Sequence, residues 1–166
     1  MNAGGRLAAG WAITGVGALF LFAIVRLGAR GISVVASGLG PSQWAVFGLL
    51  LLLFVVFEGR AALQARWVPM LVRRARDLRG SAAPSHRLLA PLYGMSLVGA
   101  SPRRLVRAWL GTLAVIVAIL LVRVLPDPWR GLIDLSVAAA LAWGLGALLI
   151  QAPDALRTVA VEDRGP

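Results

Sequence analysis

Long apolar runs separated by short polar stretches dominate the chain. Three of the runs are close to 20 residues long, whereas the third, over residues 108–122, is short and lies between Arg107 and Arg123. About 20 apolar residues cross the hydrocarbon core of a bilayer, and a bordering arginine extends a short run by reaching outward to the headgroups. The pattern therefore predicts four membrane-spanning helices, over residues 7–26, 41–59, 104–124 and 129–150.

Composition supports a membrane setting for these runs. Hydrophobic residues make up 59% of the 166 residues and charged residues only 14%, whereas about a quarter of a soluble domain is charged. Membrane bundles of this length need no second core. We therefore expect an all-α integral membrane protein, with a four-transmembrane-helix bundle forming a single membrane domain over residues 1–166. Residues 60–103 are then a cytoplasmic or interfacial segment between the second and third helices.

The arginines are distributed unevenly between the two faces of this predicted bundle. Short cytoplasmic loops are enriched in basic residues, so the richer face should be the inner one. The protein is accordingly expected in a bacterial inner (cytoplasmic) membrane, as a multi-pass protein with both termini cytoplasmic. The segment between the second and third helices holds Arg60, Arg66, Arg73, Arg74, Arg76, Arg79, Arg87, Arg103, Arg104 and Arg107, against Arg26, Arg30, Arg123 and Arg130 on the other face.

A basic amphipathic helix is predicted directly after the second span. Apolar residues recur there at a spacing of three or four, from Leu63 to Leu78, with arginines largely between them. Pro69 should interrupt this helix, with a kink near Val68 and a second piece lying along the inner leaflet. Its basic face serves either as an anchor on anionic lipid or as a docking surface for a protein partner.

Residues 88–100 form a second unusual segment, apolar but too short to span a bilayer. Pro91 and Gly94 argue against a regular buried helix. Segments of this kind are interfacial or re-entrant, and a re-entrant backbone must be covered by protein or line a wet cavity. Both alternatives remain open from the sequence.

Ser101 and Pro102 predict the start of the third span, as an N-cap followed by proline at the first helical position. The two arginines that follow should attract phosphate, and at the inner leaflet that phosphate belongs to a lipid. The net charge of +10 points to anionic headgroups rather than nucleic acid, because most arginines border apolar segments. The predicted anionic-lipid-binding residues are Arg73, Arg74, Arg76, Arg103 and Arg104.

Two carboxylates lie within or beside the predicted spans. Glu58 has no arginine three or four positions away, so its partner should come from the start of the third span, with Arg107 the expected one of three arginines. The alternatives are a hydrated residue at headgroup level or a proton or cation site. Asp134 follows Arg130 by four residues, which predicts a local ion pair, although a transport role remains open.

Small residues predict where helices approach closely. Ala138, Ala142 and Gly146 form a ridge on the fourth span, and Gly15 belongs to a similar group on the first. Such ridges allow close contact between membrane helices. They serve either packing inside the bundle or contact with a second subunit.

Residues for catalysis or for a cofactor are missing from the pattern. The sequence has no cysteine and a single histidine, His86, and it has no zinc-protease motif or carboxylate cluster for a metal. We therefore expect no cofactor and no catalytic activity. The expected function is that of an accessory, scaffold or assembly-forming component of a larger membrane complex, with membrane lipids and itself or other membrane proteins as partners. The alternative is a small transporter or channel with Glu58 and Asp134 on its pathway.

Overall fold

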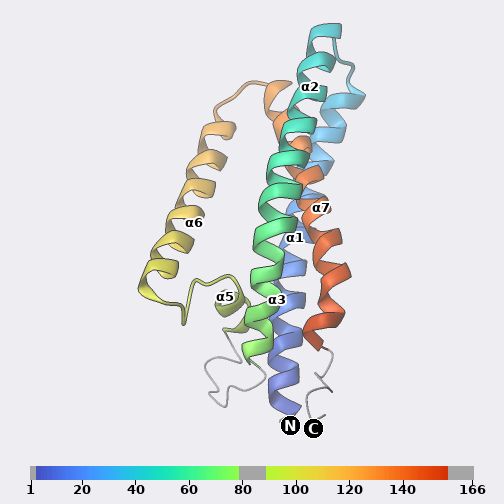
Figure 1. Ribbon diagram of the computed structural model, residues 1–166. Helices are drawn as coiled ribbons and strands as arrows, with labels where there is room; N and C mark the ends of the chain where they lie inside the picture. The colour runs from blue at the N-terminus through green and yellow to red at the C-terminus, as the bar shows by residue number, and fades with distance from the viewer. Residues whose placement is uncertain (1–2, 79–88, 157–166) are drawn as a thin grey trace.

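The computed structural model describes residues 3–78 and 89–156, and every element in these ranges is helical (Figure 1). Four helices are long and apolar enough to cross a membrane, namely Gly4–Ala36, Pro41–Asp77, Pro102–Arg123 and Trp129–Pro153. The prediction of an all-helical, multi-pass membrane protein is confirmed at this level. Interpretations that involve Arg79, His86, Arg87, Leu88 and the last ten residues fall outside the described ranges. The elements are α1 (Ala3–Ala36), α2 (Pro41–Leu53), η1 (Phe54–Trp67), α3 (Val68–Asp77), α5 (Ala90–Gly94), α6 (Pro102–Arg123) and α7 (Trp129–Leu156).

Helix α1 is much longer than the predicted span, which ended at Arg26. Its 34 residues correspond to about 50 Å at roughly 1.5 Å per residue, against about 30 Å for the hydrocarbon core. An arginine does not end a helix, and the residues after Arg26 are held by contacts with α7. The link to α2 is correspondingly short, and it turns at Gly38, whose φ is +93°.

Helices α2, η1 and α3 follow one another without a break and form one continuous helical rod (Figure 1). Within it, η1 is a π-helix of 14 residues, a type usually confined to single turns. The N–H of Val68 still donates to the carbonyl of Leu63, five residues back, and the α register resumes where Pro69, which has no N–H, follows.

The predicted break near Val68 is therefore wrong. Val68 itself is helical, with φ −61° and ψ −47°, and α3 does not turn away as a separate piece. Its apolar face packs on protein: Val68, Leu71 and Ala75 are all 0% exposed. The basic amphipathic helix exists, but its apolar side is covered by other helices of the same chain.

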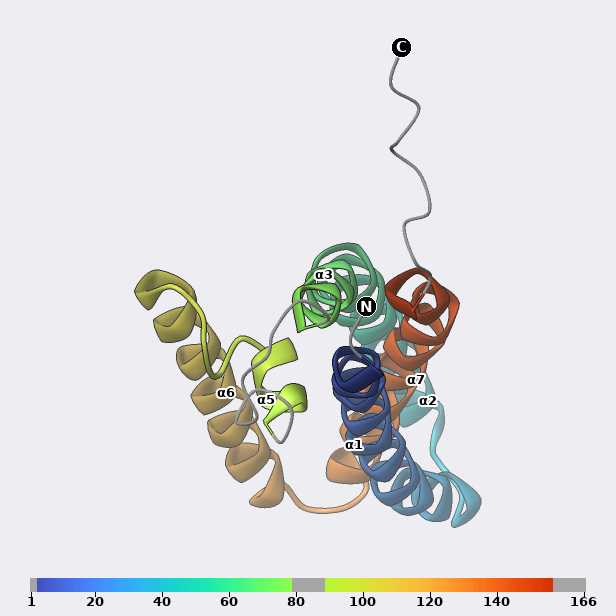
Figure 2. The same ribbon diagram turned by 90° about the horizontal axis from the view of Figure 1, so that it is seen from below.

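Helix α7 lies between α1 and the α2–η1 rod and packs against both (Figure 2). On the α1 side, a Cβ built on Gly31 would overlap the Leu135 Cβ, and one built on Gly131 would lie 2.5 Å from Val34 Cγ2. Only glycine permits this approach of the two backbones. The close crossing of α1 and α7 is the main contact of the bundle.

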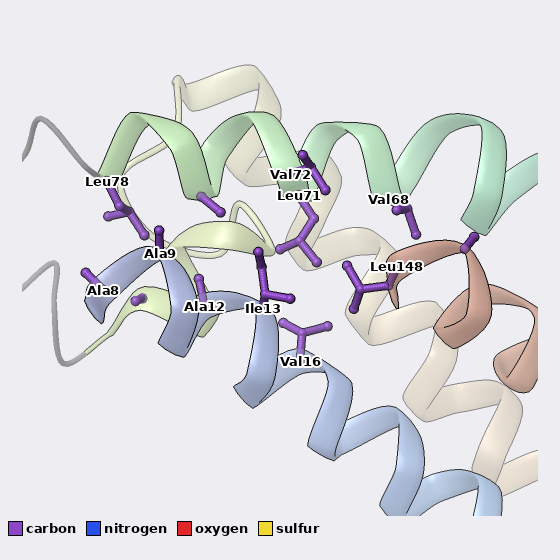
Figure 3. Close-up of a cluster of buried hydrophobic side chains, with 13 residues drawn as sticks. Ala8, Ala9, Ala12, Ile13, Val16, Val68, Leu71, Val72, Leu78 and Leu148 are labelled. Atoms are coloured by element: carbon purple, nitrogen blue, oxygen red, sulfur yellow. The ribbon is translucent and has the colours of Figure 1, made fainter. Parts of the chain in front are cut away.

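The hydrophobic core lies at the end of the molecule where α1 begins and α7 ends (Figure 3). It combines the first turns of α1, the apolar face of α3, Ala90 of α5 and Leu148 of α7. Phe20 and Trp67 stack at its margin with ring centroids 5.3 Å apart. The densest packing is thus at the arginine-rich end, and the long apolar spans are mostly exposed.

Helix α6 stands apart from the other long helices, with α5 between it and the bundle at one end (Figures 1 and 2). None of its residues is buried. Large apolar side chains are exposed all around it, including Leu110, Ile116 and Leu121. The chain therefore contains a three-helix bundle and a fourth span that this bundle does not cover.

Candidate functional site

Arginines from two separate parts of the chain meet at a cavity of about 550 Å³, here called the arginine cavity. The end of η1 and α3 provide one wall, and the start of α6 provides another. The arginines that line it are Arg66, Arg73, Arg74, Arg76 and Arg104. Four of the five residues predicted to bind anionic lipid are among them, and Arg66 was not anticipated.

Arg74 has a second role that the sequence did not reveal. Its side chain is nearly buried, with 7% exposed. Nε donates to the carbonyl of Tyr93 at 2.6 Å, and Nη2 donates to the carbonyls of Val98 and Gly99 at 3.1 and 3.2 Å. Arg74 therefore holds the turn after α5 in place, and the prediction of a simple lipid-facing arginine is incomplete.

The segment that follows α5 depends on this anchor. Gly99 has φ +64°, and a Cβ there would lie 2.7 Å from the Tyr93 ring. On the other side of α5, Gly15 and Gly94 make close contacts with Pro91 and Leu71. Ala90 and Gly94 of α5 are thus buried against α1 and α3, whereas Gly99 in the turn that follows is exposed.

Arg103 does not line the arginine cavity, unlike its neighbour Arg104. Consecutive helical side chains point in directions about 100° apart, so only one of two adjacent arginines faces a given wall. Ser101 does precede the first residue of α6 as predicted, and its carbonyl accepts from the Arg104 and Leu105 N–H groups at 2.9 Å. Its hydroxyl makes no cap bond.

Asp134 forms the predicted pair with Arg130, at 4.0 Å between Oδ2 and Nε, and a second pair with Arg30 at 3.8 Å. Arg30 also reaches Asp127, at 3.5 Å. Arg30 was not predicted as a partner, because the first span was expected to end at residue 26, whereas α1 continues to Ala36. This cluster joins α1, α7 and the link before α7 at the end opposite the arginine cavity.

The expected interhelical pair between Glu58 and Arg107 is not formed. Both side chains are exposed, and within the described residues Glu58 has no ion pair. Helix α6, which carries Arg107, stands away from η1 (Figure 1). The shared boundary of the two spans is not enough to bring the charges within reach.

The small residues predicted for packing behave differently from one another. Ala138 is buried and faces Gly28 of α1, and Gly15 packs on α5. Ala142 is exposed, and a Cβ on Gly146 would meet nothing within 4 Å. The α7 ridge is therefore used only in part within the chain.

Other close approaches were not predicted from the sequence. Beside η1, Gly59 contacts Trp143, and Gly144 contacts Leu63. The Trp143 indole Nε1 donates to Gln64 Oε1 at 2.7 Å, which satisfies both polar groups across the η1–α7 contact. The feature of the sequence that could have indicated this contact is Gln64, a polar residue within the extended second helix.

In the described part of the chain, no group of three or more histidine, cysteine, aspartate or glutamate residues is placed to hold a metal ion. No protein-family model, curated protein or solved structure matches the chain.

Proposed function

We propose that this chain is a bacterial inner-membrane protein without catalytic activity of its own, which serves as an accessory or assembly-forming component of a larger membrane complex. The observation that carries the proposal is the isolation of α6. A span whose residues are all exposed or half-buried adds nothing to the core of its own chain.

Exposure to lipid is not in itself unfavourable for α6, because acyl chains are as apolar as leucine. What favours a partner is the contrast with α1 and α7, which cross at glycines. Helix α6 offers a comparable approach at Gly111, where a Cβ would meet nothing within 4 Å. A helix from a second copy or from another protein can pack there.

The polar groups favour this reading over a transporter or channel. Asp134 is neutralised by Arg30 and Arg130, whereas a carboxylate that carries ions or protons along a pathway has to change partners. Glu58 lies on the exposed surface of η1. Ion flux through reconstituted protein that disappears in Glu58→Gln or Asp134→Asn would contradict the proposal and support transport.

Substitution of Gly111 tests the assembly directly. Gly111→Leu should leave the isolated chain unchanged, because the position is open, but it should prevent a helix from packing on α6. Gly48→Leu is the matched control, since Gly48 is equally open on α2. After gentle extraction and native mass spectrometry, we expect a complex for the unaltered chain and Gly48→Leu, and loss of the complex for Gly111→Leu.

Extraction of the unaltered chain as a single copy with lipid only would overturn the assembly proposal. Retention of the same complex by Gly111→Leu and by the control would exclude α6 as the docking helix.

The proposed orientation places the arginine cavity and both termini in the cytoplasm. Its support is the concentration of arginines on α3 and at the start of α6. Because the chain has no cysteine, single-cysteine variants can be labelled without background. An impermeant maleimide should label Ser42→Cys in intact cells and Asp77→Cys only after permeabilisation, and the reverse result would reject this topology.

A further inference from the structure

We infer that the arginine cavity binds a phosphate group, that of an anionic phospholipid headgroup, and that the bound phosphate ties α6 to α3. This inference does not depend on the assembly proposal, because it concerns a site within one chain. It rests on the convergence of charges, on the position of the cavity and on the separate origin of its walls.

Most of the charged residues that line the arginine cavity are arginines. Five guanidinium groups line a cavity of about 550 Å³, and Asp77 is the carboxylate among its described lining residues. Arg66, Arg73 and Arg104 have exposed side chains. Like charges gathered in one concave site repel each other and raise the local concentration of anions. An anion is the natural occupant.

The chemistry of guanidinium specifies the kind of anion. Its planar donors match two oxygens of a phosphate at once, and such charge-assisted pairs are shorter and stronger than neutral hydrogen bonds. Arg74 uses its Nε and Nη2 on the turn after α5. Donors for a phosphate therefore come from the exposed Arg66, Arg73 and Arg104.

The position of the cavity points to a lipid as the source of the phosphate. Arg104 lies in the first turn of α6, directly before the apolar part of that span. Val115 and Ile119, which lie on the same face of α6 as Arg104 at 3.6 residues per turn, are 59 and 50% exposed. A phospholipid with its phosphate in the cavity can lay its acyl chains along this uncovered helix.

Because the two walls of the cavity come from different helices, a bound phosphate would connect those helices. Arg104 belongs to α6, and the other four arginines belong to η1 and α3. Helix α6 otherwise packs only weakly, against α7. A phosphate held from both sides links α6 to the bundle and restrains its movement.

Native mass spectrometry with defined lipids tests the site. The purified chain is mixed with phosphatidic acid or phosphatidylcholine, and retained lipid is counted for the unaltered chain and for Arg66→Gln combined with Arg104→Gln. We expect preferential retention of phosphatidic acid and a loss of about tenfold in the variant, as for removal of charge-assisted contacts. The control is Arg103→Gln with Arg107→Gln, which removes the same charge from exposed positions outside the cavity lining.

The outcomes are distinct. Equal loss in the cavity variant and the control, or unchanged retention in both, would overturn the inference. A competition arm with inorganic phosphate separates the sources: displacement of phosphatidic acid by millimolar phosphate assigns a site for free phosphate, and lack of displacement with the variant effect intact assigns the lipid. Circular dichroism of each variant confirms that the helices are retained.

The restraint that the lipid places on α6 can be measured separately, with spin labels. Spin labels at Gly111→Cys and Gly48→Cys occupy open positions on α6 and α2, so they report the separation of the two helices. Phosphatidic acid should narrow their distance distribution in the unaltered cavity and not in Arg66→Gln with Arg104→Gln. An identical distribution with and without the lipid would reject the link between α6 and α3.

Discussion

The guanidinium carbon of Arg74 lies 4.2 Å from the centroid of the Tyr93 ring, while Nε of the same arginine donates to the Tyr93 backbone carbonyl at 2.6 Å. A cation above an aromatic face is attracted by the ring quadrupole. One arginine on α3 thus holds both the side chain and the backbone of Tyr93, which lies in the last turn of the short helix α5 (Ala90–Gly94).

Replacement of Arg74 should therefore destabilise the protein. Arg74→Ala removes three hydrogen bonds from a charged donor and leaves three carbonyls without it, which we expect to lower the free energy of unfolding by about 2–4 kcal/mol. Thermal unfolding in detergent, followed by tryptophan fluorescence, measures the change. Arg73→Ala is the control: it alters an exposed neighbour and should change stability by less than about 0.5 kcal/mol. Equal stability of the two variants would mean that the Arg74 contacts contribute nothing.

The crossing of α1 and α7 predicts a strong effect at Gly31. A Cβ there would overlap Leu135 and the Gly131 carbonyl, so Gly31→Val has to push the helices apart. We expect a loss of about 1–3 kcal/mol, as for overpacked cores. Gly146→Val, on α7 where a Cβ meets open space, should have little effect on the isolated chain. Denaturant titration of both variants checks this contrast, and similar midpoints would show that α1 and α7 do not cross at Gly31.

The two ion pairs of Asp134 predict unequal roles for the acids near Arg30. Asp134→Asn leaves Arg30 and Arg130 without this partner in a poorly hydrated position. We expect the free energy of unfolding to fall by about 1–2 kcal/mol, a value between those typical of surface and of buried ion pairs. Asp127→Asn should change stability by less than about 1 kcal/mol, because the side chain of Asp127 is 57% exposed. A double-mutant cycle of Arg30→Ala with Asp134→Asn should be non-additive. Additive changes would mean that α1 and α7 are not coupled through this pair.

Glu58 and Arg107 make no contact, so their substitutions should have additive effects, unlike those of Arg30 and Asp134. Glu58→Ala and Arg107→Ala should alter thermal stability additively, within about 0.5 kcal/mol, because the residues share no contact. The measurement is unfolding of the two single variants and the double variant in the same detergent. A coupling energy above that limit would restore the interhelical pair that the spans suggested.

Several features could be predicted because they are local properties of the chain. Hydropathy located the four spans, since 20 apolar residues suffice to cross a bilayer whatever their neighbours are. Pro41 and Pro102 marked helix starts correctly, because proline lacks the N–H that a helix interior requires. The spacing of Arg130 and Asp134 gave their pair, since residues four apart lie on one helix face.

Other features could not be predicted, because they depend on which faces of the helices pack together. Pro69 suggested a break, but Leu71 and Ala75 belong to a core shared with α1, α5 and α7, and this packing keeps α3 in line with the span. The arginine spacing assigned Arg74 to lipid, whereas its partners lie 19 to 25 residues further along the chain. Neither outcome is encoded in the residues nearby.

The sequence by itself determined which four segments are long and apolar enough to cross a membrane and where the arginines concentrate. Only the tertiary structure decided that α1 crosses α7 at Gly31 and Gly131, that Arg30 joins Asp134, and that α6 remains uncovered. The physical reason is that lipid and protein interior are equally apolar, so hydropathy does not distinguish a buried helix face from one that faces acyl chains. Contact between faces is settled by shape, and shape emerges only when the helices are placed together.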